Sequence, residues 1–201
     1  LRQGAADANA VAGGGVVFQK FSFSVNGPAE KPGPEDLALV VPDQPMSVPG
    51  PDGLFQADLT QVAAAERLRM LIGEATRVWP RIVPAARTPK NGRRIYVGYG
   101  PHLAGRVEPP TRPEGLKILE RDGDVFLLGE IAPAGTNNWP GAVDRGAMHA
   151  VETFAERVMG YRFLYSPPDD YELFELGTAI PALDTLAIEP GLRIEEAPAF
   201  Q

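Results

Sequence analysis

Residues 116–165 have the sequence LKILERDGDVFLLGEIAPAGTNNWPGAVDRGAMHAVETFAERVMGYRFLY. A β-hairpin is predicted at the start of this segment, because Asp122-Gly123 lies between two apolar runs and glycine accepts the positive φ angle that such turns require. A loop follows over residues 132–143, then an amphipathic helix, and then a strand over residues 161–165. The segment therefore predicts a helix that joins two strands and covers one face of their sheet.

The predicted helix spans residues 144–159. Its apolar residues recur at the spacing of 3.6 residues that places them on one face, and charged or polar residues occupy the opposite face. Asp144 suits the N-cap, and Gly160 suits the position just after the last turn. The face expected to pack consists of Val151, Phe154, Ala155 and Val158, and the face expected to meet solvent consists of Arg145, His149, Glu152 and Glu156.

The rest of the chain predicts one further helix and several strands. Residues 1–15 are rich in Ala, Gly and Asn and predict a mobile tail. A helix is predicted over residues 60–79, with Trp79 in its buried stripe and Pro80 ending it. Strands are predicted over residues 16–25, 37–41, 94–97, 183–188 and 192–194.

Composition and charge limit the classes of function. The 201 residues carry a net charge of −7, and residues 144–201 alone hold eleven acidic and four basic side chains. Residues 77–121 are locally basic, but their arginines are scattered, which favours a solvated surface over an anion-binding one, and no nucleic acid partner is expected. No apolar run approaches the roughly 18–20 residues of a membrane span. One main domain with flexible ends is expected.

The chain has no cysteine, so it can form no disulfide, zinc-cysteine cluster or thiol nucleophile. Its first residue is Leu1 and not Met, which suggests a processed start such as the removal of a signal peptide. An extracytoplasmic location, periplasmic or secreted, is the resulting expectation.

Gly98-Tyr99-Gly100 follows a predicted strand, which raises the possibility of a phosphate-binding loop. Pro101 and Leu103, however, stand where such a loop needs a helix start and a third glycine. A tight turn is the favoured interpretation, and no cofactor is predicted.

Five short segments together resemble a known family. In chain order they are RIYVG at 94–98, EGLKI at 114–118, VFLLG at 125–129, RGAMHAVETFAE at 145–156 and GYRFL at 160–164. Their order is similar to that in the non-catalytic N-terminal domain that precedes the barrel in α-glucuronidases and related glycoside hydrolases. It also resembles the equivalent domain of bacterial β-N-acetylhexosaminidases. The resemblance covers residues 56–200, with a longer loop at 132–143 and Ala155 in place of a large apolar residue.

The resemblance implies an α+β fold, in which a mixed β-sheet carries two main helices on one face. It implies one accessory domain over residues 16–197, and residues 198–201 resemble the start of a linker to a catalytic barrel outside this sequence. The outline is related to that of the zinc peptidases, whose chemistry needs the motif H-E-x-x-H. This chain offers only His149-Ala150-Val151-Glu152, so no metal site is predicted.

Catalysis by this chain alone is not expected. A glycosidase needs two carboxyl groups held about 5–10 Å apart across one sugar, and in the resembled enzymes both come from the barrel. Asp169-Asp170 and Glu195-Glu196 are adjacent pairs, and neighbours in an extended strand point to opposite faces. No Gly-x-Ser-x-Gly motif is present either. No catalytic residue is therefore predicted here, and the parent protein is expected to be a glycoside hydrolase.

The loop over residues 132–143 contains Trp139 beside Asn137 and Asn138. An indole face can pack on a sugar ring while amides bond its hydroxyls, so these three residues form the candidate glycan-binding site. The alternative is that Trp139 folds onto the domain. For the whole chain, the alternative to an accessory domain is a stand-alone carbohydrate-binding or protein-interaction module.

Overall fold

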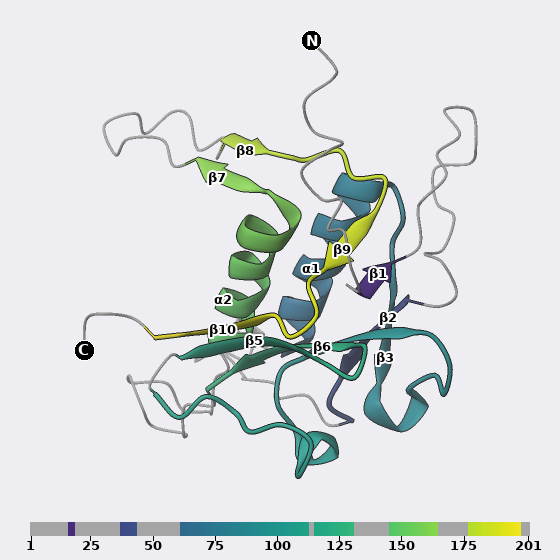
Figure 1. Ribbon diagram of the computed structural model, residues 1–201, viewed down its shortest axis with the longest axis vertical. Coiled ribbons are helices and arrows are strands. Elements are labelled where there is room, and N and C mark those ends of the chain that lie inside the picture. Colours follow the sequence, from purple (N-terminus) through teal and green to yellow (C-terminus); the bar gives the residue numbers. More distant parts are fainter. Residues whose placement is uncertain are drawn as a thin grey trace, which may run out of the picture.

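A computed structural model of the chain describes residues 16–18, 37–43, 61–112, 115–130, 145–164 and 177–197. Its centre is a six-stranded mixed sheet with the strand order β10-β5-β6-β4-β2-β3 (Figure 1). The strands β6, β4, β2 and β3 are parallel neighbours, whereas β5 runs antiparallel to both β6 and β10. The six strands are β2 Leu37–Val41, β3 Arg81–Pro84, β4 Arg93–Val97, β5 Leu116–Arg121, β6 Asp124–Gly129 and β10 Arg193–Glu196.

Two helices, α1 Gln61–Thr76 and α2 Arg145–Phe154, pack on the same face of this sheet and against each other (Figure 1). α1 contacts β2, β3 and β4, whereas α2 contacts β5 and β6. Because both helices bury an apolar stripe against the sheet, one continuous core forms between them. The predicted α+β class, a mixed sheet with two main helices on one face, is confirmed.

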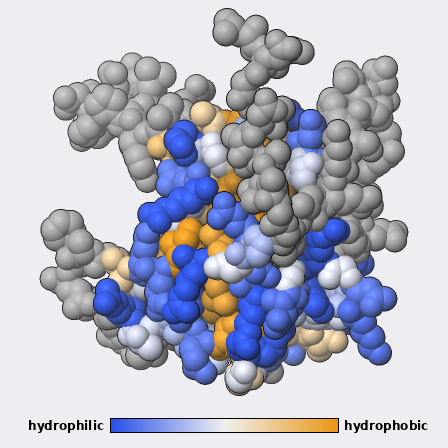
Figure 2. Space-filling model, in the orientation of Figure 1, coloured by the Kyte–Doolittle hydropathy of each residue, from blue (hydrophilic) through white to orange (hydrophobic). Residues whose placement is uncertain are grey.

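The apolar interior is enclosed by a largely hydrophilic surface. In Figure 2, hydrophilic side chains flank a narrow apolar strip in the middle of this side of the molecule. The large apolar side chains that are exposed among the described residues are Val62, Met70 and Ile180. By contrast, Leu39 and Leu127 on the helix side of the central strands and Val40 and Leu128 on the opposite side are all completely buried. These strands are therefore buried on both faces, as parallel sheets usually are.

The hairpin that organises the sequence is confirmed. β5 and β6 pair from Leu116 with Gly129 to Arg121 with Asp124, which leaves Asp122 and Gly123 as the two turn residues. Both have positive φ angles, 55° and 82°. This is the turn whose twist matches that of the two strands, and Asp-Gly is one of the few pairs that adopt it without strain.

The second helix begins where the sequence predicts, but it ends in an unexpected way. α2 continues into a π-helical turn, Ala155–Met159, which is wider than an α-helical turn. Val151, Phe154 and Ala155 are buried as predicted, and Val158 packs against the core while partly buried. In the wider turn Met159, which was not predicted to pack, is fully buried as well. Gly160 closes the helix with a left-handed φ of 85°.

The strand after α2 does not join the main sheet, and the predicted strand-helix-strand unit is wrong at this point. β7 Arg162–Leu164 pairs with β8 Gly177–Ala179 in a separate ribbon, at the other end of the helices from β5 and β10 (Figure 1). Tyr161 explains why the chain turns away from the main sheet after α2. Its fully buried hydroxyl donates a hydrogen bond to the backbone oxygen of Leu71 in α1 at 2.6 Å. Burial, with the nearby charge of Glu74, raises the pKa of Tyr161 to about 12, so this donor stays protonated at neutral pH.

The first helix ends at Thr76 and not at Trp79. Arg77 takes a left-handed φ of 62°, and the hydroxyl of Thr76 accepts a hydrogen bond from the backbone nitrogen of Val78 at 3.1 Å. The half-buried Trp79 then folds back on the helix at Gly73, where a Cβ would lie 2.2 Å from the indole nitrogen. Trp79 therefore lies beyond the end of α1 and packs against it. The chain then continues into β3, a strand that was not predicted.

The remaining strands lie against the helices or at the edge of the sheet. β1 Val16–Phe18 pairs with β9 Leu186–Ile188, and Leu186 and Ile188 complete the core. The two predicted C-terminal strands are thus present as β9 and β10, with bounds shifted by a few residues, but they do not pair with each other. The predicted tail over residues 1–15, the rest of the predicted first strand, and residues 198–201 lie outside the described residues.

Candidate functional site

The strand order reverses between β2 and β4. The chain leaves β2, passes through α1 and enters β3 on one side of β2, while β4 lies on the other side. Ligands of open sheets bind outside the carboxyl ends of the strands at such a point. The side chains that the fold brings there form the switch-point site, which consists of Asp43 after β2, Gln61 at the start of α1, and Tyr99 and His102 after β4.

The switch-point site is filled by the protein itself. The buried Gln61 side chain donates from Nε2 to the backbone oxygen of Tyr99 at 2.9 Å. A Cβ on Gly98 would lie 2.5 Å from Gln61 Cγ, so Gln61 occupies the space next to the glycine turn. Gly98 has a φ of 80°, in agreement with the predicted tight turn. A phosphate could not reach the backbone here as it does in a dinucleotide-binding loop.

His102 lies in the short 3₁₀ helix η2 Pro101–Leu103 and packs its ring on Tyr96 of β4, with the ring centres 5.9 Å apart. Its Nε2 atom is shielded from solvent and has no hydrogen-bond partner among the described residues. Burial lowers the pKa of His102; the charge of Asp43 opposes this and that of Arg106 adds to it. His102 is therefore neutral at pH 7, but its enclosed Nε2 cannot reach a substrate as a general base would.

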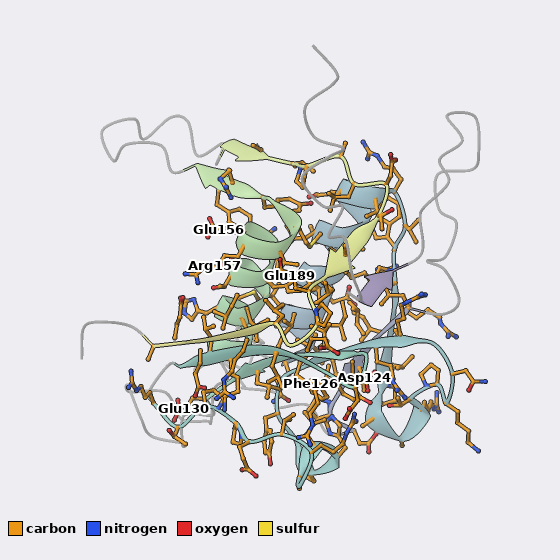
Figure 3. The ribbon with its side chains drawn as sticks, in the orientation of Figure 1. Asp124, Phe126, Glu130, Glu156, Arg157 and Glu189 are labelled. Atoms are coloured by element: carbon orange, nitrogen blue, oxygen red, sulfur yellow. The ribbon has the colours of Figure 1, made fainter. Side chains whose placement is uncertain are left out.

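A second cluster of charge lies under the sheet, on the face opposite the two helices, which we call the far face. Asp124 is 1% exposed and accepts hydrogen bonds from Arg94 Nε at 2.7 Å and Arg106 at 2.9 Å. Arg106 also donates to the Tyr96 hydroxyl at 3.0 Å and lies over the rings of Tyr96 and Phe126. Figure 3 shows Asp124 and Phe126 on the side of the sheet away from α2. We refer to Asp124, Arg94 and Arg106 as the Asp124 cluster.

Residues 98–112, which we call the strap, cross the far face and bury its apolar side chains. The guanidinium of Arg121 donates to the Arg106 backbone oxygen, and Lys117 Nζ donates to the Glu108 backbone oxygen at 3.0 Å. The apolar cluster thus covered consists of Ala38, Val40, Tyr96, Leu103, Val107, Phe126 and Leu128. One face of the sheet is therefore covered by helices and the other by the strap.

The Asp124 cluster was not predicted from the sequence. Asp124 directly follows the predicted Asp122-Gly123 turn, and Arg106 is one of the scattered arginines of the basic run. The available signal was an acidic residue directly before the buried run of β6, where an unpaired charge would be costly. Since Arg94, Arg106, Lys117 and Arg121 all bond within the protein, much of the basic run serves the fold and not an anionic ligand.

The adjacent carboxylates of β10 are held in ion pairs to different partners. Glu195 pairs with Lys117 at 3.5 Å and Arg193 at 3.0 Å, whereas Glu196 pairs with Arg157 at 2.6 Å. Burial opposes ionisation of Glu195, but the hydrogen bond from Arg193 and the charge of Lys117 outweigh it and lower the pKa of this carboxyl. A glycosidase acid needs the opposite shift, so the two side chains behave as structural partners.

The three predicted glycan-binding residues, Trp139, Asn137 and Asn138, lie outside the described residues, as do Asp169 and Asp170. Their role stays a prediction. His149 is exposed on α2, as expected. Within the described ranges no three His, Cys, Asp or Glu side chains gather in a way that could hold a metal ion. None of the described helices has the length and apolar character needed to cross a bilayer.

No model of a protein family matches the chain, and no curated protein sequence matches it.

Proposed function

We propose that this chain is a non-catalytic accessory domain of a carbohydrate-active glycoside hydrolase of the α-glucuronidase-like kind, packed against that enzyme's catalytic barrel. The main support for the proposal is the arrangement of the segments that resemble the N-terminal domains of these glycoside hydrolases. β4, the hairpin of β5 and β6, and α2 follow one another as in the resembled domains, and they build a mixed sheet with both helices on one face.

The chemistry of the described side chains agrees with a supporting role. Glu195 and Glu196 are held in ion pairs, and Asp124 is enclosed by two arginines. His102, the histidine of the switch-point site, has its Nε2 atom shielded from solvent. These groups hold elements of the domain together. Turnover is thus assigned to carboxylates of the attached barrel, as in the resembled enzymes.

The barrel is proposed to contact the β10 side of the domain. β10 is an edge strand of the sheet, and it forms part of the acidic region at residues 144–201. Its carboxylates are half-exposed, and the Glu196–Arg157 ion pair links the strand to the end of α2. An edge strand whose carboxylates form ion pairs suits a polar interface with another domain. Interfaces between domains of one chain are usually polar in this way.

The loop over residues 132–143 is proposed to reach the rim of the barrel's active site. In the sequence it lies between β6 and α2, and both of these elements pack in the core of the domain. A rigid support at each end suits a binding loop. In this proposal Trp139 packs on a sugar ring, and Asn137 and Asn138 bond its hydroxyls.

Replacement of Trp139 by alanine in the complete enzyme tests this part of the proposal. KM for the natural glycan is expected to rise about 2- to 10-fold with little change in kcat, because stacking of this kind contributes equally to ground and transition states. Trp139→Phe should retain most of the affinity, and His149→Ala, on the exposed face of α2, should leave it unaltered. Unchanged KM in Trp139→Ala would remove the loop from the substrate site while leaving the accessory role open.

A further inference from the structure

Two side chains hold the strap on the far face of the sheet: Arg106 through polar and ionic contacts, and His102 through packing of its ring. Arg106 holds it through Asp124 and Tyr96, and His102 holds it through packing on Tyr96. The His102 ring also lies against Gly100, where a Cβ would come within 3.1 Å of Nδ1. The ring therefore lies close to both the sheet and the backbone of the strap, with little room to move.

The charged and titratable groups that face His102 come from three elements. β4 contributes the Tyr96 hydroxyl, the end of β2 contributes Asp43, and the strap itself contributes Arg106. Asp43 is already engaged, since its Oδ1 accepts a hydrogen bond from the backbone nitrogen of Ala86 at 2.6 Å. Arg106 is a permanent cation, and its guanidinium lies over the same Tyr96 ring that His102 packs against.

We propose that the strap is an acid-sensitive cover, which protonation of His102 releases from the far face of the sheet. A protonated ring places a second cation beside Arg106, and both of its nitrogens then carry a hydrogen, so Nε2 is a donor in a shielded position where the described residues offer it no acceptor. When the strap lifts, water solvates the ring nitrogens and screens the repulsion between His102 and Arg106, which move together on the strap. This inference does not depend on the proposed accessory function.

The direction of the pH effect follows from linkage. Burial depresses the pKa of His102 in the folded protein below its ordinary value of 6.5, with Arg106 adding to the shift. The unfolded or open chain therefore binds the proton more tightly than the closed one. Stability from the closed strap is complete above the unfolded pKa and is lost as pH falls toward and through the folded pKa. Acid opens the strap, and a return to neutral pH closes it.

Hydrogen exchange on the full chain at pH 7.5 and 5.5, corrected for the intrinsic pH dependence of exchange, tests the proposal. Protection of strap amides such as those of Arg106 and Val107, which bond to the Leu103 backbone oxygen, should be lost at pH 5.5, whereas amides of β6 keep theirs. The chain has two histidines, which provides a matched pair of variants. His102→Gln should abolish the acid response, and His149→Gln should preserve it.

Three results would overturn the acid-sensitive cover. These are strap protection that does not change with pH, equal loss of protection in the strap and β6, and an acid response that persists in His102→Gln. If His102→Gln does not fold, the histidine ring resonances of the unmodified chain decide the question. The pKa of His102 must then lie below its ordinary value of 6.5, and strap amide resonances must shift along with His102.

Discussion

Asp124→Asn is expected to lower the free energy of unfolding by about 2–4 kcal/mol. The substitution removes a buried charge that two arginines share, and breaking such a pair costs about 3–5 kcal/mol when all partners are buried. Arg94 and Arg106 are 25% and 42% exposed, so water compensates them in part and the expected loss is smaller. Urea denaturation at pH 7 measures it. The strap should loosen as well, because Arg106 loses its main anchor.

A matched control lies two residues earlier. Asp122→Asn makes the same chemical change in the hairpin turn, where the side chain is 85% exposed and 3.6 Å from Arg121. Such an exposed ion pair contributes little to stability, and asparagine tolerates the left-handed backbone at this position. The free energy of unfolding should therefore change by no more than about 0.5 kcal/mol. Equal effects of the two substitutions would contradict the role assigned to the Asp124 cluster.

Phe126→Ala is expected to lower the free energy of unfolding by about 3–5 kcal/mol, the usual loss for a fully buried phenylalanine. The ring is 0% exposed and stacks on Tyr96 with ring centres 5.0 Å apart, beneath the guanidinium of Arg106. Its removal opens a cavity between the sheet and the strap that the rigid strands cannot close. Urea denaturation again provides the measurement.

The control for Phe126 is Val62→Ala, at an exposed position of α1, which should change stability by less than about 0.5 kcal/mol. A loss below 1 kcal/mol in Phe126→Ala would mean that the far face is not a packed core, and the strap would then not be the cover described above. A loss in the expected range, with the m-value unchanged, supports a second core on this face.

Local patterns predicted the elements whose signals lie within a few residues of each other. The Asp122-Gly123 turn and the apolar stripe of α2 need no knowledge of the rest of the chain, and both are present. No strand was predicted at β3, which is short, begins directly after Pro80 and ends with Pro84. Proline is tolerated at the ends of an edge strand, and β3 is the edge of the sheet.

The errors arise where tertiary packing overrides the local pattern. Trp79 continues the periodicity of α1, yet it folds back on Gly73 once Arg77 reverses the chain. The strand after α2 is directed away from the sheet by the contact of Tyr161 with Leu71, ninety residues away in sequence. A sequence pattern holds no record of such a contact, so the separate ribbon of β7 and β8 could not have been predicted.

The same argument applies to the candidate site. Arg94 and Arg106 reach Asp124 across 30 and 18 residues, and these pairings come from the sheet order and the path of the strap. The chain offers several arginines at similar spacing, and nothing local distinguishes these two. By contrast, the opposite-face argument for Glu195 and Glu196 needs only strand geometry, and their separate ion-pair partners agree with it.

The central claim, an accessory domain within a larger hydrolase, is tested most directly by the intact mass of the protein as isolated from its source. We predict a mass well above the 21.6 kDa of this chain, by at least the roughly 250 residues that a catalytic barrel needs. Glycoside hydrolase activity should accompany that mass. A mass equal to that of the chain would contradict the claim and favour a stand-alone carbohydrate-binding or interaction module.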